Sequence, residues 1–267
     1  MSTDTMFEGT IPALYNRYLV PLLFDDYAHK AARRVASWTP RDILETAAGT
    51  GILTTALREE NPDARILATD LNEAMLAVLD ARGLPGETAS RYADALDLPC
   101  RDESFDAVVC QFGIMFFPDK VQGNREAHRV LRDGGRYLLV IWDKLSANPS
   151  QRVVEEALKP MFPDNPPSFI SRMPFGYSEH EQIEADLHAA GFEDVEIETI
   201  EGRSRAISPH HAAIGLTQGS PMRLEIEARD PSRLNEATER VAEALTALGN
   251  ESAVTVPMSA LFVTATK

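Results

Sequence analysis

The chain is poor in cysteine, in positive charge and in long apolar stretches, and each shortage excludes a class of protein. Only two of its 267 residues are cysteines, Cys100 and Cys110. They lack metal-ligand spacing, so they predict free thiols in a reducing compartment rather than a disulfide scaffold or a zinc site. No apolar run approaches the length of a membrane span, and the first residues lack the basic and apolar regions of a signal peptide. We therefore expect a cytoplasmic protein.

The charge balance is strongly acidic. Asp and Glu number 41 against 26 Lys and Arg, which gives a formal net charge of −15. Proteins that bind phosphate backbones do so with clustered Lys and Arg, so we expect no nucleic-acid partner. The hydrophobic share of 44% and the charged share of 25% are ordinary for a globular chain with a large core.

A glycine-containing turn is the most informative motif. Residues 45–51 read Glu-Thr-Ala-Ala-Gly-Thr-Gly, between a short apolar strand at 43–44 and a helix-like run that begins at Ile52. Glycine lets a backbone approach a ligand without a Cβ in the way, and the first N–H groups of the following helix face that ligand. The pattern predicts a nucleotide-like cofactor, or else only a tight turn.

A second apolar strand at 66–69 ends in Asp70, about one helix and one strand after the turn. A carboxylate at the tip of that strand can accept hydrogen bonds from the two hydroxyls of a ribose. The alternative is that Asp70 caps the helix that starts near Asn72.

The third glycine of a dinucleotide fingerprint is missing, because Thr54 occupies its position. A nicotinamide-dependent oxidoreductase shares the glycine turn and the acidic residue, so it is the rival enzyme class. Further along stand Asp94-Ala95 before Leu98-Pro99, a buried strand at 105–112, and Gly134-Gly135 before a strand at 137–141. These later motifs favour a cofactor other than a nicotinamide dinucleotide.

In this order and spacing, the motifs over residues 40–143 resemble the class I S-adenosylmethionine-dependent methyltransferases, and more narrowly their small-molecule ubiquinone and menaquinone biosynthesis branch. Glu45 departs from the aspartate of many members, and Ala48 from their cysteine or serine. The resemblance implies an α/β fold, a Rossmann-like seven-stranded mixed sheet with an antiparallel last strand, flanked by helices and a helical or loop cap. It implies S-adenosylmethionine as cofactor and in-line methyl transfer to a small, apolar or aromatic acceptor, which demands no fixed catalytic residue.

The resemblance also implies the cofactor contacts. Glu45 would engage the cofactor's ammonium, Asp70 its ribose, and the side chains near Asp94 its adenine. The implied set is Tyr18, Glu45, Ala47, Gly49, Gly51, Asp70, Leu71, Met75, Asp94, Ala95, Leu96, Gln111 and Phe112. For Leu71, Met75 and Leu96, simple core packing is the alternative.

One domain spanning 1–267 is expected, with several parts. These are an N-terminal helical lid at 1–38, a cofactor-binding core at 39–143, cap insertions at 144–180 and 201–230, and C-terminal strands at 192–200 and 253–266. The stretch 160–177 combines proline with large apolar residues, whereas loops are usually polar, so we expect it to cover something.

Four residues are candidates for the acceptor pocket: Tyr15, Phe169, Phe175 and His180. Each has an alternative: Tyr15 and Tyr18 as residues that pack the first helix onto the domain, the apolar loop as a dimer contact, and His180 as a solvated residue at a helix start. His210 and His211 are adjacent and do not share a helix face, so no metal site is expected. The acceptor, the methylated atom and the choice between monomer and homodimer stay open, and so does a non-catalytic, cofactor-binding regulator.

Overall fold

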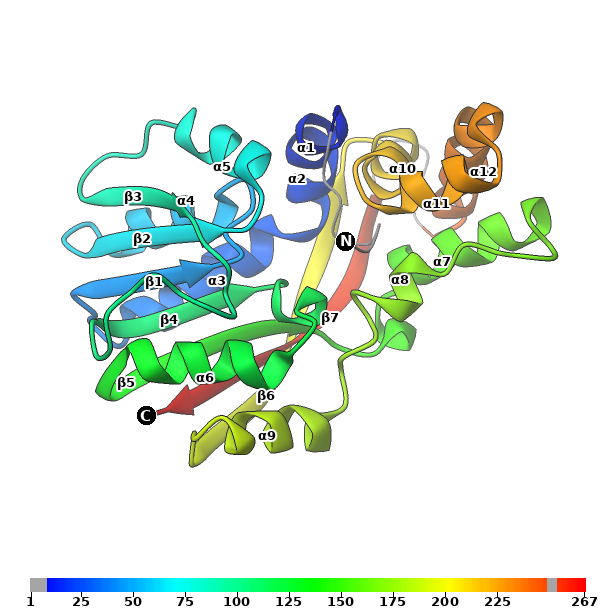
Figure 1. Cartoon of the computed structure of the whole chain (residues 1–267). Helices are drawn as coiled ribbons and strands as arrows, with labels where there is room; N and C mark the ends of the chain where they lie inside the picture. Colours follow the sequence, from blue (N-terminus) through cyan, green and yellow to red (C-terminus); the bar gives the residue numbers. More distant parts are fainter. Residues whose placement is uncertain (1–8, 249–253) are drawn as a thin grey trace. The chain divides into compact units, whose positions relative to one another are not determined.

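The computed structural model describes residues 9–248 and 254–267, and the chain forms two compact units (Figure 1). Over the described residues, the helical unit comprises residues 9–26, 143–176, 201–248 and 254–259, and the sheet unit comprises residues 27–142, 177–200 and 260–267. Residues 1–8 of the predicted lid and residue 253 of the predicted last strand lie outside the described residues. The predicted cofactor-binding core falls in the sheet unit.

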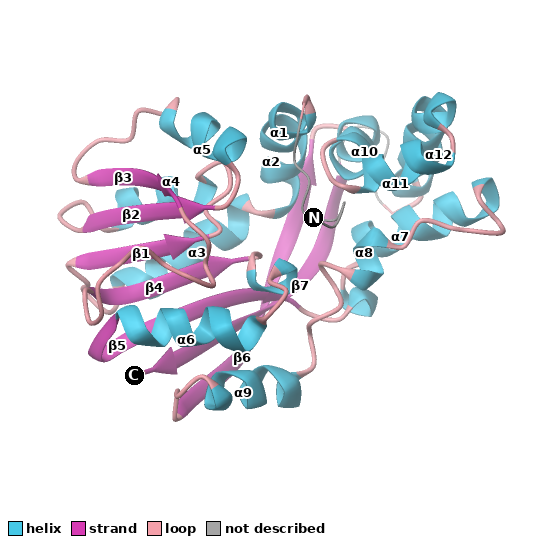
Figure 2. Ribbon diagram, in the orientation of Figure 1, coloured by secondary structure: helices cyan, strands magenta, loops and turns pink. Residues whose placement is uncertain are grey.

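Over the described residues, seven strands form one sheet in the order β3-β2-β1-β4-β5-β7-β6. The strands are β1 (Asp42–Thr46), β2 (Arg65–Asp70), β3 (Thr88–Tyr92), β4 (Phe105–Gln111), β5 (Leu131–Trp142), β6 (Asp194–Ala206) and β7 (Val254–Thr266). Strands β1 to β5 are parallel, whereas β7 is antiparallel to both β5 and β6. Figure 2 shows the arrow of β7 pointing opposite to those of β1, β2 and β4. The predicted fold class is confirmed.

The central strands are buried, and β4 and β5 are buried along continuous apolar runs. All five residues of β1 are buried, and so are residues 107–110 of β4 and 137–142 of β5. Such runs are typical of parallel strands covered by helices on both faces. Parallel strands also bring all their carboxyl ends to one edge, where ligands of open α/β sheets bind.

Helices cover both faces of the sheet. They are α3 (Asp25–Ala36), α4 (Ile52–Glu60), α5 (Glu73–Asp80), η3 (Ile114–Phe116), α6 (Lys120–Val130) and α9 (His180–Ala189). Figure 1 shows α6 and α9 on the near face and α3 and α4 on the far face. Arg34 of α3 makes two hydrogen bonds to Glu198 of β6, at 3.0 and 2.8 Å, which join helix and strand.

The helical unit contains short helices around α10. Its helical segments are α1 (Ile11–Leu14), η2 (Tyr15–Leu19), α2 (Val20–Leu23), η4 (Leu145–Ala147), α7 (Pro149–Leu158), η5 (Lys159–Met161), α8 (Phe169–Arg172), α10 (Pro209–Gln218), α11 (Met222–Arg229), η6 (Pro231–Arg233) and α12 (Leu234–Thr246). A Cβ at Gly215 of α10 would lie 3.0 Å from the carbonyl carbon of Tyr18. The π-helix η2 therefore packs backbone to backbone on α10.

The structure refines two of the predicted parts. The helical lid expected at 1–38 consists, over its described residues, of the four segments α1, η2, α2 and α3, and Pro21, which has no N–H to continue the preceding turn, lies in the first turn of α2. The strand expected at 192–200 continues to Ala206 as part of β6. In the described part of the chain, no helix is both long and apolar enough to span a bilayer.

Candidate functional site

The glycine turn between β1 and α4 is held in a strained and closely packed conformation. Ala47, Gly49 and Gly51 have φ angles of +53°, +56° and +81°. A Cβ at Gly51 would lie 2.6 Å from Cγ of Leu79 on α5. A Cβ at Gly113, just after β4, would lie 2.5 Å from Cβ of Ala47. The turn thus fits tightly between α5 and the end of β4, and this packing demands glycine even before a ligand is considered.

The Glu45 side chain lies under this turn and is 2% exposed. Its Oε2 accepts a hydrogen bond of 2.6 Å from the hydroxyl of Thr54 on α4. Burial raises the pKa of Glu45 to about 8, against the lowering effect of the Thr54 hydrogen bond, and the Asp70 charge raises it further. At neutral pH the carboxyl group is therefore largely protonated, and a cation placed beside it would favour the carboxylate.

Asp70 at the end of β2 reaches back to the turn. Its Oδ2 accepts the N–H of Gly49 and its Oδ1 accepts the N–H of Asn72, each over 2.8 Å. Burial raises the pKa of Asp70, while these backbone N–H donors oppose the rise. Each carboxylate oxygen has a second lone pair, so Asp70 can still accept hydrogen bonds from a ligand.

The cap of α5 is not Asp70 but Asn72. The Asn72 Oδ1 accepts the N–H groups of Ala74 and Met75, at 2.9 and 3.1 Å. The capping alternative for Asp70 is therefore wrong, because the helix already has a side-chain cap two residues later. The carboxylate of Asp70 serves the glycine turn instead.

The loop after β3 is hydrogen-bonded to the end of β2, at the same edge of the sheet. Ala93 donates its N–H to the carbonyl of Asp70 over 3.1 Å. The exposed Asp94 accepts the N–H of Leu96 over 2.9 Å, and Gln122 of α6 donates to the Leu96 carbonyl over 3.1 Å. The structure thus places Asp94, Ala95 and Leu96 beside the end of β2.

The apolar members of the predicted set differ in exposure. Leu71 is 53% exposed, one of three large hydrophobic side chains exposed in the described residues. Met75 is 4% exposed and packs in the core, and Leu96 is half-buried. The core-packing alternative therefore fails for Leu71, which presents an apolar surface next to Asp70.

Gln111 is the last residue of β4, and Phe112 follows it at this edge. The Oε1 of Gln111 is buried and has no hydrogen-bond partner among the described residues. Phe112 has a φ of +51° and stacks on Trp142 at the end of β5, with ring centroids 4.0 Å apart and an interplanar angle of 18°. A buried acceptor without a donor is costly, so the edge is complementary to a ligand that donates a hydrogen bond there.

The remaining candidates occupy different places. In the helical unit, the Tyr15 ring contacts Phe24 at 5.6 Å between centroids, and the Tyr18 ring contacts His211 at 4.8 Å. Phe169 and Phe175 of the same unit are 4% and 8% exposed. In the sheet unit, His180 is exposed at the first residue of α9. Their proposed role toward an acceptor stays a prediction.

The apolar stretch 160–177 is tethered within its own unit up to residue 176. Ser168 donates its N–H to Glu225 of α11 over 2.8 Å, and Arg172 pairs with the same carboxylate at 2.8 Å. Ser171 donates its N–H to Glu155 of α7 over 3.0 Å.

Over the described ranges, no three His, Cys, Asp or Glu side chains come together as a metal site.

Two residues of the site are not predicted from the sequence. Thr54 stands out there only because it occupies the third-glycine position, whereas in the structure its hydroxyl donates to Glu45. A hydroxyl at the third-glycine position, one helical turn after the second glycine, was the available signal. Trp142 had none, because only the pairing of β4 with β5 brings it against Phe112.

These groups together define what the edge can bind. Glu45, Asp70 and Gln111 offer oxygen acceptors, Leu71 offers an apolar surface, and the Arg82 guanidinium that reaches the turn donates to the Thr50 carbonyl over 2.6 Å. The three acceptors and the apolar surface fit a cation that carries hydroxyls and a flat ring. S-adenosylmethionine, which has an ammonium, a sulfonium, a ribose and an adenine, fits this description.

Comparisons with known proteins agree with this geometry. A family model described as "Methyltransferase domain" matches residues 44–139. The demethylmenaquinone methyltransferase of Mycolicibacterium vanbaalenii is 31% identical over 71% of this chain and 83% of its own length. That of Deinococcus radiodurans is 36% identical over 52% of this chain and 59% of its own length. The match thus spans little more than half of the latter protein.

A solved structure shows the same fold. Phosphoethanolamine N-methyltransferase 2 of Haemonchus contortus, in complex with S-adenosyl-L-methionine, superposes with a TM-score of 0.62. It is 17% identical, and the superposition covers 100% of this chain and 60% of that protein. At this identity the likeness is one of fold alone.

Proposed function

Because this chain belongs to the class I S-adenosylmethionine-dependent methyltransferases of the ubiquinone and menaquinone type, we propose that it methylates a small aromatic acceptor, a hydroxylated ring of the reduced-quinone class. The sequence relatives support this acceptor class, because two of them are named for the methylation of demethylmenaquinone. The Phe112 and Trp142 rings stack on each other at the ends of β4 and β5, where they form a buried aromatic pair behind the cofactor edge.

The observation that carries the proposal is the set of oxygen acceptors that Glu45, Asp70 and Gln111 place at this edge. S-adenosylmethionine supplies a methyl group on a positively charged sulfur, which is activated for displacement. Glu45 would take the ammonium and Asp70 the ribose hydroxyls. The unpartnered Oε1 of Gln111 would accept a hydrogen bond from the methionine end.

The chain's own contribution to the reaction would be position and the exclusion of water. The glycine turn is fixed by Leu79 on one side and by the Asp70 carboxylate on the other. Fixed groups hold a reactant at its attack distance without reordering during the step, and this can supply much of the rate. The residues Tyr15, Tyr18, Phe169, Phe175 and His180 stay predictions for acceptor contacts.

The alternatives differ in what they bind and whether they turn over. A nicotinamide enzyme is set aside by the family membership, and Thr54 in place of the third glycine agrees. A non-catalytic protein would have the same cofactor edge, so only turnover separates it from an enzyme.

The experiment is a radiolabelled methyl-transfer assay on the full chain. Its acceptors are a reduced naphthoquinone, a simple phenol and an aliphatic amine. We expect label in the reduced naphthoquinone and release of S-adenosylhomocysteine. Transfer to the amine alone would refute the acceptor class. Tight S-adenosylhomocysteine binding without transfer to any acceptor would indicate the non-catalytic protein instead.

A further inference from the structure

Three side chains on one face of α6 hold the loop that joins β3 to β4, residues 93–104. Gln122, Glu126 and Arg129 follow one another at intervals of four and three residues, so they lie on the same face of the helix. Each of them bonds the main chain of the loop, and Gln122 does so by donating to the Leu96 carbonyl over 3.1 Å. We call these three residues the α6 clamp.

Glu126 and Arg129 hold the middle of the loop. Glu126 accepts the N–H of Leu98 over 2.7 Å, and Arg129 donates to the carbonyl of the same residue over 3.0 Å. Arg129 also donates to the Cys100 carbonyl over 2.8 Å and pairs with Asp102 at 2.7 Å. These contacts fix the loop from residue 98 to residue 102.

The two charged members of the clamp also fix each other. Glu126 is buried, and its two carboxylate oxygens accept hydrogen bonds of 2.8 and 2.6 Å from Arg129. The Arg129 guanidinium holds the pKa of Glu126 below its ordinary value, although burial opposes this. Because paired N–H donors match both oxygens of a carboxylate, the two side chains have one defined geometry.

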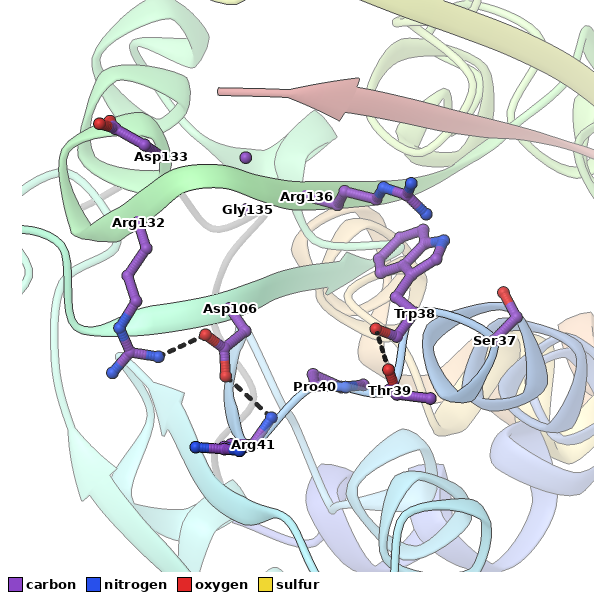
Figure 3. A pocket seen from close by; sticks show the side chains of 11 residues that line it. Ser37, Trp38, Thr39, Pro40, Arg41, Asp106, Arg132, Asp133, Gly135 and Arg136 are labelled. Atoms are coloured by element: carbon purple, nitrogen blue, oxygen red, sulfur yellow. Dashed lines mark hydrogen bonds and ion pairs between the residues drawn. The ribbon is translucent and has the colours of Figure 1, made fainter.

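The helix that bears the clamp is anchored at both ends. At its start, Asp119 caps α6 by accepting the N–H of Gln122 over 2.9 Å. Just after its end, Arg132 forms ion pairs with Asp106 near the start of β4 and, at 2.9 Å, with Asp42 at the start of β1. Figure 3 shows the Arg132 guanidinium against the Asp106 carboxylate. The sheet therefore sets the position of α6, and α6 sets the position of the loop.

Leu96 links the clamp to the proposed cofactor site. Its carbonyl accepts the Gln122 amide, while its N–H donates to the Asp94 carboxylate over 2.9 Å. The Asp94 side chain is exposed, and Ala93 before it donates its N–H to the Asp70 carbonyl at the end of β2. Loosening Leu96 thus frees the Asp94 carboxylate to turn, whereas the backbone before it stays bonded to the sheet.

We propose that the α6 clamp makes the cofactor site selective for adenine. Gln122, Glu126 and Arg129 are positioning residues that act on the ligand through Leu96 and Asp94. The inference rests on the proposed function and on the adenine contact expected of the residues near Asp94. A carboxylate held in place accepts a hydrogen bond from the adenine amino group and repels a carbonyl oxygen at that position, whereas a mobile one turns away and loses both effects.

The test is calorimetry on the full chain with S-adenosylhomocysteine and S-inosylhomocysteine, in which a carbonyl oxygen replaces the adenine amino group. The parent protein should bind the adenine probe about tenfold or more tightly than the inosine probe. Gln122→Ala and Arg129→Lys should each lower this preference about threefold or more. Alanine favours helix, so Gln122→Ala keeps α6 and removes only the bond to Leu96.

The matched control is Gln182→Ala on α9, which loses an exposed bond of 2.7 Å to Asp186. It should leave the preference within about twofold of the parent value. In an Asp94→Ala background, Gln122→Ala should also change the preference by less than about twofold, because the carboxylate through which the clamp acts is gone.

Three results would overturn the inference and leave the proposed function standing. They are a parent protein that binds both probes equally, an unchanged preference in both clamp variants, and an equal loss from Gln122→Ala with and without Asp94. A parent protein that does not bind S-adenosylhomocysteine would instead refute the proposed function, and the inference with it.

Discussion

Gly49 donates its backbone N–H to the Asp70 carboxylate over 2.8 Å, so one side chain joins the turn after β1 to the end of β2. Gly49 follows β1, and Asp70 is the last residue of the neighbouring parallel strand β2. The same carboxylate also accepts the Asn72 N–H. Asp70 therefore has two duties. It shapes the turn and it offers its remaining lone pairs to a ligand.

Asp70→Ala should lose both duties. Removing charge-assisted hydrogen bonds is expected to cost about 1.5–3 kcal/mol of S-adenosylhomocysteine affinity. The orphaned Gly49 N–H should lower the free energy of unfolding by about 1–3 kcal/mol. Calorimetry and urea unfolding measure the two effects, with Asp63→Ala as an exposed control. A folded variant with unchanged affinity would remove Asp70 from the cofactor site.

Gly51→Ala should be far more damaging than Gly83→Ala. Both glycines have positive φ, +81° and +61°, but a Cβ at Gly83 meets nothing within 4 Å whereas one at Gly51 meets Leu79. Gly83→Ala should cost about 1–3 kcal/mol of unfolding free energy through backbone strain alone. Gly51→Ala should cost about 1–3 kcal/mol more through overpacking.

The double variant Gly51→Ala with Leu79→Ala separates clash from strain. Because it removes the side chain that the new Cβ would strike, the two effects should be less than additive in urea unfolding. Full additivity would show that Leu79 does not constrain the turn.

The fold could be predicted from the sequence because apolar runs, turn glycines and strand-end carboxylates repeat in a βα order. The positions of Glu45, Gly49 and Asp70 followed from the same pattern. What escaped prediction depends on contacts between distant segments. The alanine at position 47 gives no hint that Gly113 must be small, and Trp142 shows no motif that pairs it with Phe112. Which residue caps α5 depends on nearby residues only, and the structure has Asn72 as the cap. Because asparagine and aspartate are both favoured caps, the sequence does not choose between Asn72 and Asp70.

In the ligand-free protein, the contribution of Glu45 to stability should fall as pH rises. The pKa of Glu45 is raised to about 8 in the folded chain, from an ordinary value of 4.5. Between these values the folded state holds a proton that the unfolded state has lost, so raising pH favours unfolding. The contribution of this group is about 1.4 kcal/mol per pH unit.

Glu45→Gln should remove this contribution. Urea unfolding of both proteins at several pH values between 5 and 7.5, at constant ionic strength, gives the difference. Equal slopes for the two proteins would mean that Glu45 is already ionised in the folded chain.

Cofactor binding should release a proton near neutral pH. An ammonium beside Glu45 favours its carboxylate, so the proton on the buried side chain leaves for the buffer. The apparent binding enthalpy of S-adenosylhomocysteine should therefore differ between two buffers of unlike ionisation enthalpy. Glu45→Gln should reduce that difference sharply, and a buffer-independent enthalpy in the parent protein would contradict the placement of the ammonium.

The most direct measurement is a calorimetric titration of the full chain with S-adenosylmethionine, S-adenosylhomocysteine and NAD. The oxygen acceptors of Glu45, Asp70 and Gln111 predict micromolar-range binding of the first two and no competition from NAD. Tight binding of NAD together with no response to S-adenosylmethionine would contradict the account.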